Sequence, residues 1–201
     1  MLLPCVIAIE GAIGSGKSTQ LELLRQRDHV CFSEPVEKWT NFNGRDLLKN
    51  FYEDNTLKSA LELQWYITTT LKERALEIEQ ALKSYSIVFV ERSFRSSLGV
   101  FISIMDDTYG PHAEIEDIKK FILDLVNEHE KDYHSILLKV SPNVAYNRST
   151  IRQRQGEDTM TPTYNKLVTN KVNAMTYHKT IDCDDLNSAE VVAIILNYIK
   201  Q

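Results

Sequence analysis

The sequence predicts an α/β fold in which helices cover both faces of a parallel β-sheet. Short apolar runs rich in β-branched residues alternate with longer amphipathic segments, which is typical of repeated strand–helix units. Runs such as Ile87–Val90 are too apolar for a sheet that leaves one face in water. A glycine-rich turn, Gly11–Gly16, joins the first apolar run to the first amphipathic segment, as in α/β folds that bind phosphate groups.

Five short runs predict the strands of this sheet. They are rich in Val, Ile or Phe and alternate with segments of helical character, so consecutive strands should run parallel. We expect strands at Val6–Glu10, Val30–Phe32, Ile87–Glu91 and Ser135–Val140, with the weakest pattern at Thr180–Asp182.

Longer segments with apolar residues at helical spacing predict the helices. In the longest of them Leu57, Leu61 and Trp65 recur every four residues, so this face should lie along the core or a partner helix. Pro142 and Pro162 suit first-turn positions. The least regular stretch is Asp106–Glu114, whose Tyr109-Gly-Pro111 should form a turn. We expect helices at Lys17–Arg27, Leu57–Ser84, Ser93–Met105, Ile115–Glu128, Pro142–Arg154, Pro162–Tyr177 and Ser188–Ile199.

Length and composition limit the possible classes of protein. The 201 residues are 43% hydrophobic, enough for one sizeable core, so we expect a single domain over residues 1–201. A formal net charge of −5 argues against a surface for duplex nucleic acid. Three widely separated cysteines indicate neither disulfides nor zinc. The sequence shows no signal peptide, transit peptide or membrane span, so we expect a cytoplasmic protein that binds neither nucleic acid nor membrane.

The strongest motif is G-x-x-x-x-G-K-S, directly after the first predicted strand. In such a loop the backbone N–H groups and the helix N-terminus face phosphates, Lys17 supplies a positive charge, and Ser18 can ligate Mg²⁺. An ordinary glycine-rich turn is the alternative, and the motif leaves the phosphate acceptor undefined. The candidate phosphate-binding residues are Gly11, Ala12, Ile13, Gly14, Ser15, Gly16, Lys17, Ser18 and Thr19.

A second motif, Glu34-Pro-Val-Glu-Lys-Trp39, follows the second predicted strand. The carboxyl ends of parallel strands form the ligand crevice of such sheets, so an acid and an aromatic ring would face the phosphates. A carboxylate there can accept the proton of an attacking hydroxyl, and Trp39 offers a flat face for a planar ring. The alternative is a commonplace strand exit at Glu-Pro.

A third motif, Glu91-Arg92-Ser93, ends the apolar run Ile87–Val90. An acid at this position can hold Mg²⁺, directly or through water, and an arginine can fix an acceptor or neutralise developing charge. The alternative is a surface ion pair followed by Ser93 as a helix cap, and the capping role is compatible with both readings.

A fourth motif places Arg148, Arg152 and Arg154 at the end of a predicted helix that runs into a polar loop. Cations that close over phosphates are a recurrent device in phosphoryl transfer, where positioning and charge neutralisation do most of the work. A solvated basic helix end is the alternative, because positive charge near a helix C-terminus is favourable.

Taken together, the four motifs resemble the deoxyribonucleoside kinase family, which contains deoxycytidine kinase, deoxyguanosine kinase, mitochondrial thymidine kinase and a broad-specificity insect enzyme. Their order and approximate spacing match over nearly the whole chain. The resemblance implies a P-loop kinase with a five-stranded parallel sheet flanked by helices, a short basic lid and a homodimeric state. It also implies transfer of the γ-phosphoryl group of ATP, with Mg²⁺, to the 5′-hydroxyl of a deoxynucleoside.

The resemblance assigns catalytic roles to matching residues. Glu34 corresponds to the family's general base, which acts on the 5′-hydroxyl. Arg92 is expected to hydrogen-bond in the region of this acceptor hydroxyl, and Lys17 is expected to contact the phosphates. Ser18 and Glu91 are expected near Mg²⁺, with Glu91 reaching the ion through water. The lid is expected at about residues 148–158, where Arg148, Arg152 and Arg154 grip the phosphates.

Further matches concern the sugar and the base. Tyr52 and Glu157 fall where the family holds the 3′-hydroxyl, and Gln64 falls where it reads the base edge. An amide suits this task because it offers both a donor and an acceptor. Trp39 and Phe101 would border the ring. Alternatively, Tyr52 and Phe101 are core aromatics.

Two departures from the family pattern bear on specificity. Members that favour deoxycytidine and purines carry an Arg seven residues after the base-reading Gln and an Asp six after the Glu of Glu-Arg-Ser. Leu71 and Ser97 occupy these positions here. The resemblance to thymidine-accepting members therefore predicts a pyrimidine preference that includes thymidine. Residues 182–188, where the family holds the donor adenine, match only loosely.

Two other functions are compatible with the phosphate loop. Thymidylate kinase shares the sheet, the acid–arginine pair and the lid, but it should carry an extra Arg after the second strand to bind a monophosphate. Lys38 is the only cation of Glu34–Trp39. A nucleotide-dependent switch should carry Asn-Lys-x-Asp, which the segment 170–173 approaches without its final acid.

Overall fold

The protein forms a five-stranded parallel sheet, seen in a computed structural model that describes residues 5–152, 154–155 and 157–200. The strand order is β2-β3-β1-β4-β5, and every neighbouring pair is parallel. This confirms the predicted α/β class and the five-stranded sheet. The strands are β1 Cys5–Gly11, β2 Val30–Phe32, β3 Ile87–Glu91, β4 Tyr133–Lys139 and β5 Lys179–Asp182.

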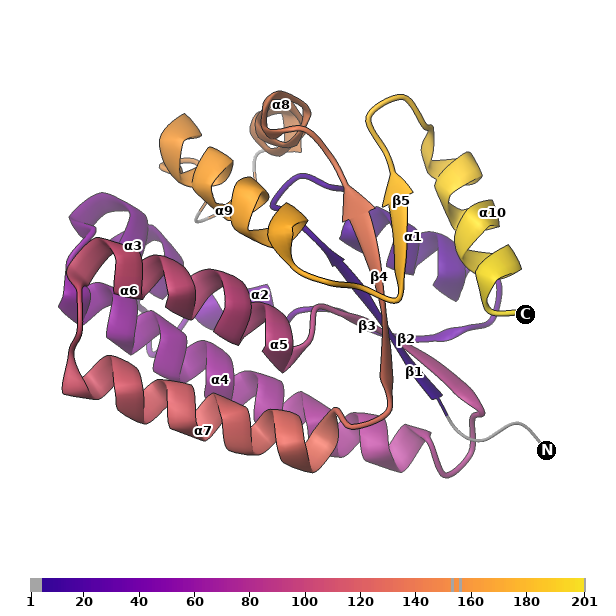
Figure 1. Ribbon diagram of the computed structural model, residues 1–201, viewed down its shortest axis with the longest axis horizontal. Coiled ribbons are helices and arrows are strands. Elements are labelled where there is room, and N and C mark those ends of the chain that lie inside the picture. The colour runs from indigo at the N-terminus through magenta and orange to yellow at the C-terminus, as the bar shows by residue number, and fades with distance from the viewer. Residues whose placement is uncertain (1–4, 153, 156, 201) are drawn as a thin grey trace.

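Helices flank the sheet and build a thick layer beside it (Figure 1). Within the described ranges, no helix combines the length and apolar character needed to cross a bilayer. The helices are α1 Lys17–Arg25, α2 Val36–Trp39, α3 Leu47–Asp54, α4 Leu57–Ala81, α5 Phe94–Ser96, the π-helical η1 Ser97–Ile102, α6 Ser103–Tyr109, α7 Ala113–His129, α8 Pro142–Arg152, α9 Pro162–Ala174 and α10 Ser188–Tyr198.

The alternation of side chains along β1 explains why both faces of the sheet are covered. Ile7 and Ile9 pack in a cluster with residues of α1 and α10. Val6 and Ala8 point to the other face, where Ile78 of α4 joins their cluster. Because both faces are buried, the strand reads as a continuous apolar run, and all carboxyl ends lie at one edge of the sheet.

Two short helices were not predicted, and one predicted helix ends later than expected. Helices α2 and α3 lie in a region without predicted elements, because they are too short to show a helical period. Asp46 caps α3 by accepting the N–H of Lys49 at 2.8 Å. The turn expected at Tyr109-Gly-Pro111 is confirmed, since Gly110, with φ 76°, and its neighbours separate α6 from α7. However, α6 continues to Tyr109, whereas the predicted helix ended at Met105.

Candidate active site

The phosphate loop connects β1 directly to α1 and is tightly packed. Gly14 has φ 88°, and a Cβ there would lie 2.0 Å from the Ala145 carbonyl oxygen of α8, so only glycine fits. Gly16, the residue before α1, has φ 96° but faces open space. Lys17 is buried and its Nζ donates to the Ala12 carbonyl at 2.9 Å. The loop therefore curls around an ammonium group that is held inward.

Burial strongly affects the charge of Lys17. Removal from water, followed by repulsion from Arg92, lowers the pKa of Lys17 to about 7, although the Glu91 and Glu34 carboxylates oppose this shift. A phosphate anion placed beside this ammonium would favour its charged form. The loop is thus suited to an anionic ligand.

A hydroxyl and a carboxylate meet beside the loop. Ser18 Oγ donates to Glu91 Oε1 at 2.9 Å, and Arg154 Nη2 donates to Ser18 Oγ at 3.2 Å. Oxygen ligands of these two kinds suit Mg²⁺, which usually takes few protein ligands and completes its shell with water and phosphate. The described part of the chain contains no group of three or more His, Cys, Asp or Glu side chains able to hold a metal.

The second and third motifs meet as a buried ion pair. Arg92 Nη1 lies 2.5 Å from Glu34 Oε2, and each side chain is only 7% exposed. Burial by itself raises the pKa of Glu34, but the Arg92 and Lys17 cations outweigh it and hold this pKa below its ordinary value. Glu34 is therefore a carboxylate at neutral pH.

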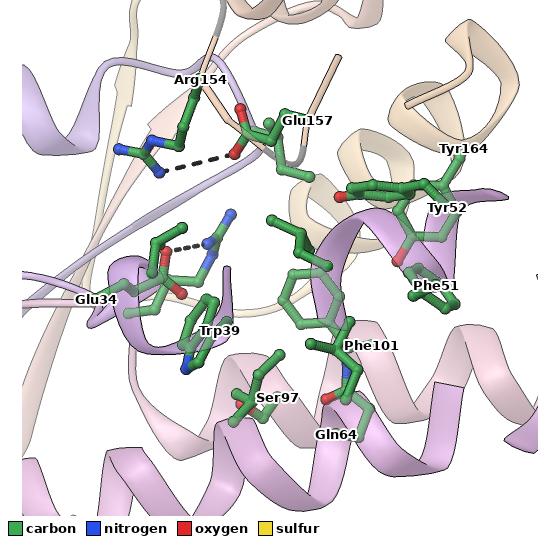
Figure 2. Close-up of a pocket in the computed structure, with 16 residues that line it drawn as sticks. Glu34, Trp39, Phe51, Tyr52, Gln64, Ser97, Phe101, Arg154, Glu157 and Tyr164 are labelled. Carbon is green, nitrogen blue, oxygen red and sulfur yellow. Dashed lines mark hydrogen bonds and ion pairs between the residues drawn. The ribbon is translucent and has the colours of Figure 1, made fainter. Parts of the chain in front are cut away.

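A pocket opens next to this ion pair (Figure 2). It encloses about 550 Å³ of space, part of it open to solvent. Figure 2 shows Glu34 and Trp39 on one side, Tyr52 and Tyr164 opposite, and Gln64 below. The lining residues that the sequence singled out are Ile13, Glu34, Trp39, Tyr52, Gln64, Arg92, Ser97, Phe101, Arg154 and Glu157.

Trp39 of α2 and Gln64 of α4 differ in how their polar atoms are paired at this pocket. Trp39 Nε1 donates to Thr70 Oγ1 at 2.9 Å, which fixes the indole against α4. Gln64 is 5% exposed, and its Oε1 is buried without a hydrogen-bond partner among the described residues. Buried polar atoms are almost always paired, so an orphan acceptor in a pocket wall marks a place where a ligand donor would fit.

Leu71 and Arg148 do not reach this pocket. Leu71 is 3% exposed and belongs to the hydrophobic core around α4. Arg148 Nη2 donates to the Cys183 carbonyl at 3.0 Å and lines a separate cavity on the other side of the phosphate loop. That cavity also includes Thr19 and Asn187. Because residues of the phosphate loop and of the segment 182–188 line this cavity together, the segment expected to hold the donor adenine lies beside the phosphate loop.

Two of the three arginines expected in the lid form ion pairs with Glu157. Arg152 Nη2 binds Glu157 Oε2, and Arg154 Nη1 lies 3.7 Å from Glu157 Oε1, the pair drawn at the top of Figure 2. Of the segment 148–158 expected for the lid, Gln153 and Gly156 lie outside the described residues. Arg154 connects the phosphate loop to the pocket, because its side chain contacts both Ser18 and Glu157.

Several residues of the site carry no motif. Phe51 and Tyr164 complete the aromatic wall beside Tyr52, with ring centroids 5.3–5.5 Å apart. Arg74 is 8% exposed and donates to the Glu91 and Arg92 carbonyls at 2.7 and 2.9 Å. The only sequence signal of Arg74 is its position on the buried face of α4, where a charge is rare unless it is paired.

Three features define the class of protein as a P-loop phosphotransferase. They are the P-loop, the Glu34–Arg92 pair at two strand ends, and the basic segment in which Arg154 contacts Ser18. The sequence pattern of the deoxynucleoside kinase family matches residues 7–199. The chain therefore belongs to the deoxynucleoside kinase family, and it is a nucleoside kinase that takes its phosphate from ATP.

Individual relatives carry different substrate names. Kinase protein 143R of Invertebrate iridescent virus 6, whose name is provisional, is 29% identical over 174 residues, covering 83% of this chain and 79% of that protein. Mitochondrial thymidine kinase 2 of Homo sapiens is 35% identical over 100 residues, covering 45% and 37%. Deoxycytidine kinase 2 of Gallus gallus is 25% identical over 217 aligned positions, covering 95% and 81%.

Proposed function

We propose that this kinase phosphorylates the 5′-hydroxyl of pyrimidine deoxynucleosides, thymidine included. The observation that carries the proposal is the position of Glu34. Its side chain lines the pocket that holds Trp39 and Gln64, and it also lines the cavity beside Ser18 and Glu91. A hydroxyl at this junction would face a base on one side and the phosphate loop on the other.

The catalytic steps follow from these contacts. Glu34 accepts the proton of the attacking hydroxyl, and Arg92 orients the carboxylate and then neutralises charge that develops near it. Lys17 and the lid residues Arg152 and Arg154 stabilise the transferring phosphoryl group. Ser18 and Glu91 are the residues that would hold Mg²⁺, which when bound neutralises phosphate charge.

The remaining residues of the pocket orient the nucleoside. Gln64 pairs with the base edge, because its unpartnered acceptor and its NH₂ can serve either cytosine or thymine. Trp39 and Phe101 border the ring. Tyr52 and Glu157 bind the 3′-hydroxyl, as the family resemblance implies.

The pyrimidine preference rests on a pocket floor without a charged pair. Ser97 lines the pocket without charge, and Leu71 lies in the hydrophobic core, so neither position offers the ion pair expected of purine-accepting members. Steady-state kinetics with the four deoxynucleosides test this. We expect kcat/KM for thymidine and deoxycytidine to exceed that for both purines, and a preference for deoxyguanosine or deoxyadenosine would overturn it.

The alternative acceptor, a nucleoside monophosphate, is less well supported. Lys38 is the only cation of Glu34–Trp39, and its Nζ already lies 2.9 Å from Glu73 Oε2 at the surface. A switch function finds little support too. Asp107–Gly110 has the Asp-x-x-Gly form, but it lies at the end of α6, whereas the acid beside Ser18 is Glu91.

We also propose that residues 1–201 form one kinase domain that pairs as a homodimer. Helices α4 and α7 lie side by side (Figure 1), and their surface exposes Trp65, Leu76 and Leu123 at 37%, 52% and 48%. Trp65 stacks on Phe121 across the two helices. Light scattering after gel filtration should give a dimer mass for the protein and a monomer mass for Leu123→Asp, and a monomeric wild type would contradict the proposal.

A further inference from the structure

The corner after β3 has an unusual backbone conformation. Arg92 has φ 56°, in the left-handed region that costs free energy for a residue with a side chain. Its N–H donates to the Ile9 carbonyl at 3.0 Å, so the corner stays tied to β1. Since Arg92 also pairs with Glu34, the strained residue is one that we place in the catalytic machinery.

Glu10 holds the other side of this corner. It is the penultimate residue of β1 and 1% exposed. Its Oε1 accepts the N–H of Ser93 at 3.0 Å and the hydroxyl of Ser93 at 2.6 Å, while its Oε2 accepts the hydroxyl of Ser96. A buried carboxylate with three donors fixes the chain immediately after Arg92.

The residue that follows Glu10 holds the opposite end of Arg92. The Gly11 carbonyl accepts a hydrogen bond from Arg92 Nη2 at 3.2 Å. Two consecutive residues at the end of β1 thus fix both the backbone beside Arg92 and its guanidinium. Because Gly11 is also the first residue of the phosphate loop, this end of β1 links the loop to the acceptor side.

We propose that Glu10 is a positioning residue that sets the orientation of Arg92 toward Glu34 and the acceptor hydroxyl. The proposal rests on the function proposed above for Arg92. Glu10 acts through the Ser93 backbone, and it touches neither the nucleoside pocket nor the cavity beside Ser18.

Glu130 offers a matched control. It too is a buried glutamate, 1% exposed, and it accepts the next two N–H groups of the same helix start, from Phe94 at 2.5 Å and from Arg95 at 3.3 Å. Both glutamates therefore satisfy helix N–H groups that lack internal partners. They differ in that Glu10 binds Ser93, the residue adjacent to Arg92, as well as Ser96, whereas the N–H groups that Glu130 accepts belong to Phe94 and Arg95.

The test compares the two isosteric variants. We expect Glu10→Gln to lower kcat about tenfold with KM for ATP unchanged, because misplaced positioning groups reduce rate more than binding. Glu130→Gln should lower the melting temperature and leave kcat unchanged in the folded enzyme. Equal kcat values for the two variants would overturn the proposal. If Glu10→Gln does not fold, Ser93→Ala removes one donor to Glu10 and should still lower kcat by about twofold to threefold, whereas an unchanged kcat would contradict us.

A double-mutant cycle distinguishes the positioning role of Glu10 from the proposed function of Arg92. If Glu10 acts through Arg92, Glu10→Gln should change kcat little in an Arg92→Lys background, and additive effects would overturn the positioning role. An Arg92→Lys enzyme with wild-type kcat would refute the proposed function of Arg92 itself. A slow Arg92→Lys enzyme beside a fully active Glu10→Gln enzyme would refute only the role of Glu10.

Discussion

The phosphate loop and the nucleoside pocket meet at Glu34, yet they are built in different ways. The loop consists of consecutive residues between β1 and α1, held by contacts such as Lys17 Nζ to the Ala12 carbonyl. The pocket takes its walls from α2, α3, α4, η1 and α9, together with the segment around Glu157. A local motif can therefore define the donor, whereas the acceptor depends on how distant segments pack.

Glu34 lines both the nucleoside pocket and the cavity beside Ser18 and Glu91, and its replacement should give the largest effect. Glu34→Gln keeps the shape of the side chain but removes the proton acceptor, so we expect kcat to fall about 10²- to 10⁴-fold with both KM values nearly unchanged. Glu37→Gln, an exposed glutamate three residues further along in α2, is the control and should be near wild type. Wild-type turnover by Glu34→Gln would show that Glu34 is not the base.

The donor region alone is tested by two glycine variants. Gly14→Ala and Gly16→Ala both place a side chain at positive φ, but only the former meets the Ala145 carbonyl. We expect Gly14→Ala to lose about 2 kcal/mol more of unfolding free energy than Gly16→Ala and to bind ATP far more weakly. Chemical denaturation and nucleotide titration measure both quantities. Equal losses would mean that the close packing of the loop on α8 is unimportant.

The acceptor region alone is tested at Gln64. Gln64→Leu removes the buried amide from the pocket wall, so KM for the nucleoside should rise about 10- to 100-fold while KM for ATP stays constant. Gln80→Leu, on the exposed side of the same helix, is the matched control. A Gln64→Leu enzyme that changes only KM for ATP would contradict the separation of the two regions.

The smallest expected effect is a change in protonation at Lys17. In the free protein this ammonium has a pKa of about 7 because it is buried, so it is largely neutral at pH 8. A bound phosphate raises the pKa, and binding of ATP should then take up close to one proton per site at pH 8. Calorimetry in two buffers of different ionisation enthalpy measures this uptake. An Lys17→Met variant should show none, and equal uptake by both proteins would exclude Lys17 as its source.

The same depressed pKa has a consequence for stability. Lys17 is charged in the unfolded chain up to its ordinary pKa of 10.5, but in the folded protein only up to about pH 7. The unfolded chain therefore binds more protons between these values, so the contribution of Lys17 to the unfolding free energy rises with pH across this window. Lys17→Met should remove that rise, as measured by denaturation at pH 7 and pH 9.

The sequence predicts features formed by neighbouring residues better than features formed by distant segments. The strands and the phosphate loop are each recognised from a short stretch of consecutive residues, and both were predicted. Helix α3 was missed because eight residues are too few for a clear helical period. Glu10 and Arg74 look like ordinary charged residues, and only the packing of β1 and α4 against the corner at Arg92 gives them partners.

The specificity residues show a further limit. Positions 71 and 97 were paired by their places in two motifs, yet only Ser97 lines the pocket while Leu71 lies in the core. Side-chain direction on α4 depends on how that helix is rotated against its neighbours, which a motif does not record. Arg148 is similar, since the rotation of α8 turns it toward the Cys183 carbonyl.

The most direct test of the account identifies the product by phosphorus NMR. The protein is incubated with Mg·ATP and thymidine, and separately with thymidine monophosphate. We predict thymidine 5′-monophosphate and ADP in equal amounts from the first mixture, and no thymidine diphosphate from the second. Phosphorylation of the monophosphate alone, with no product from any deoxynucleoside, would contradict the assignment of the acceptor.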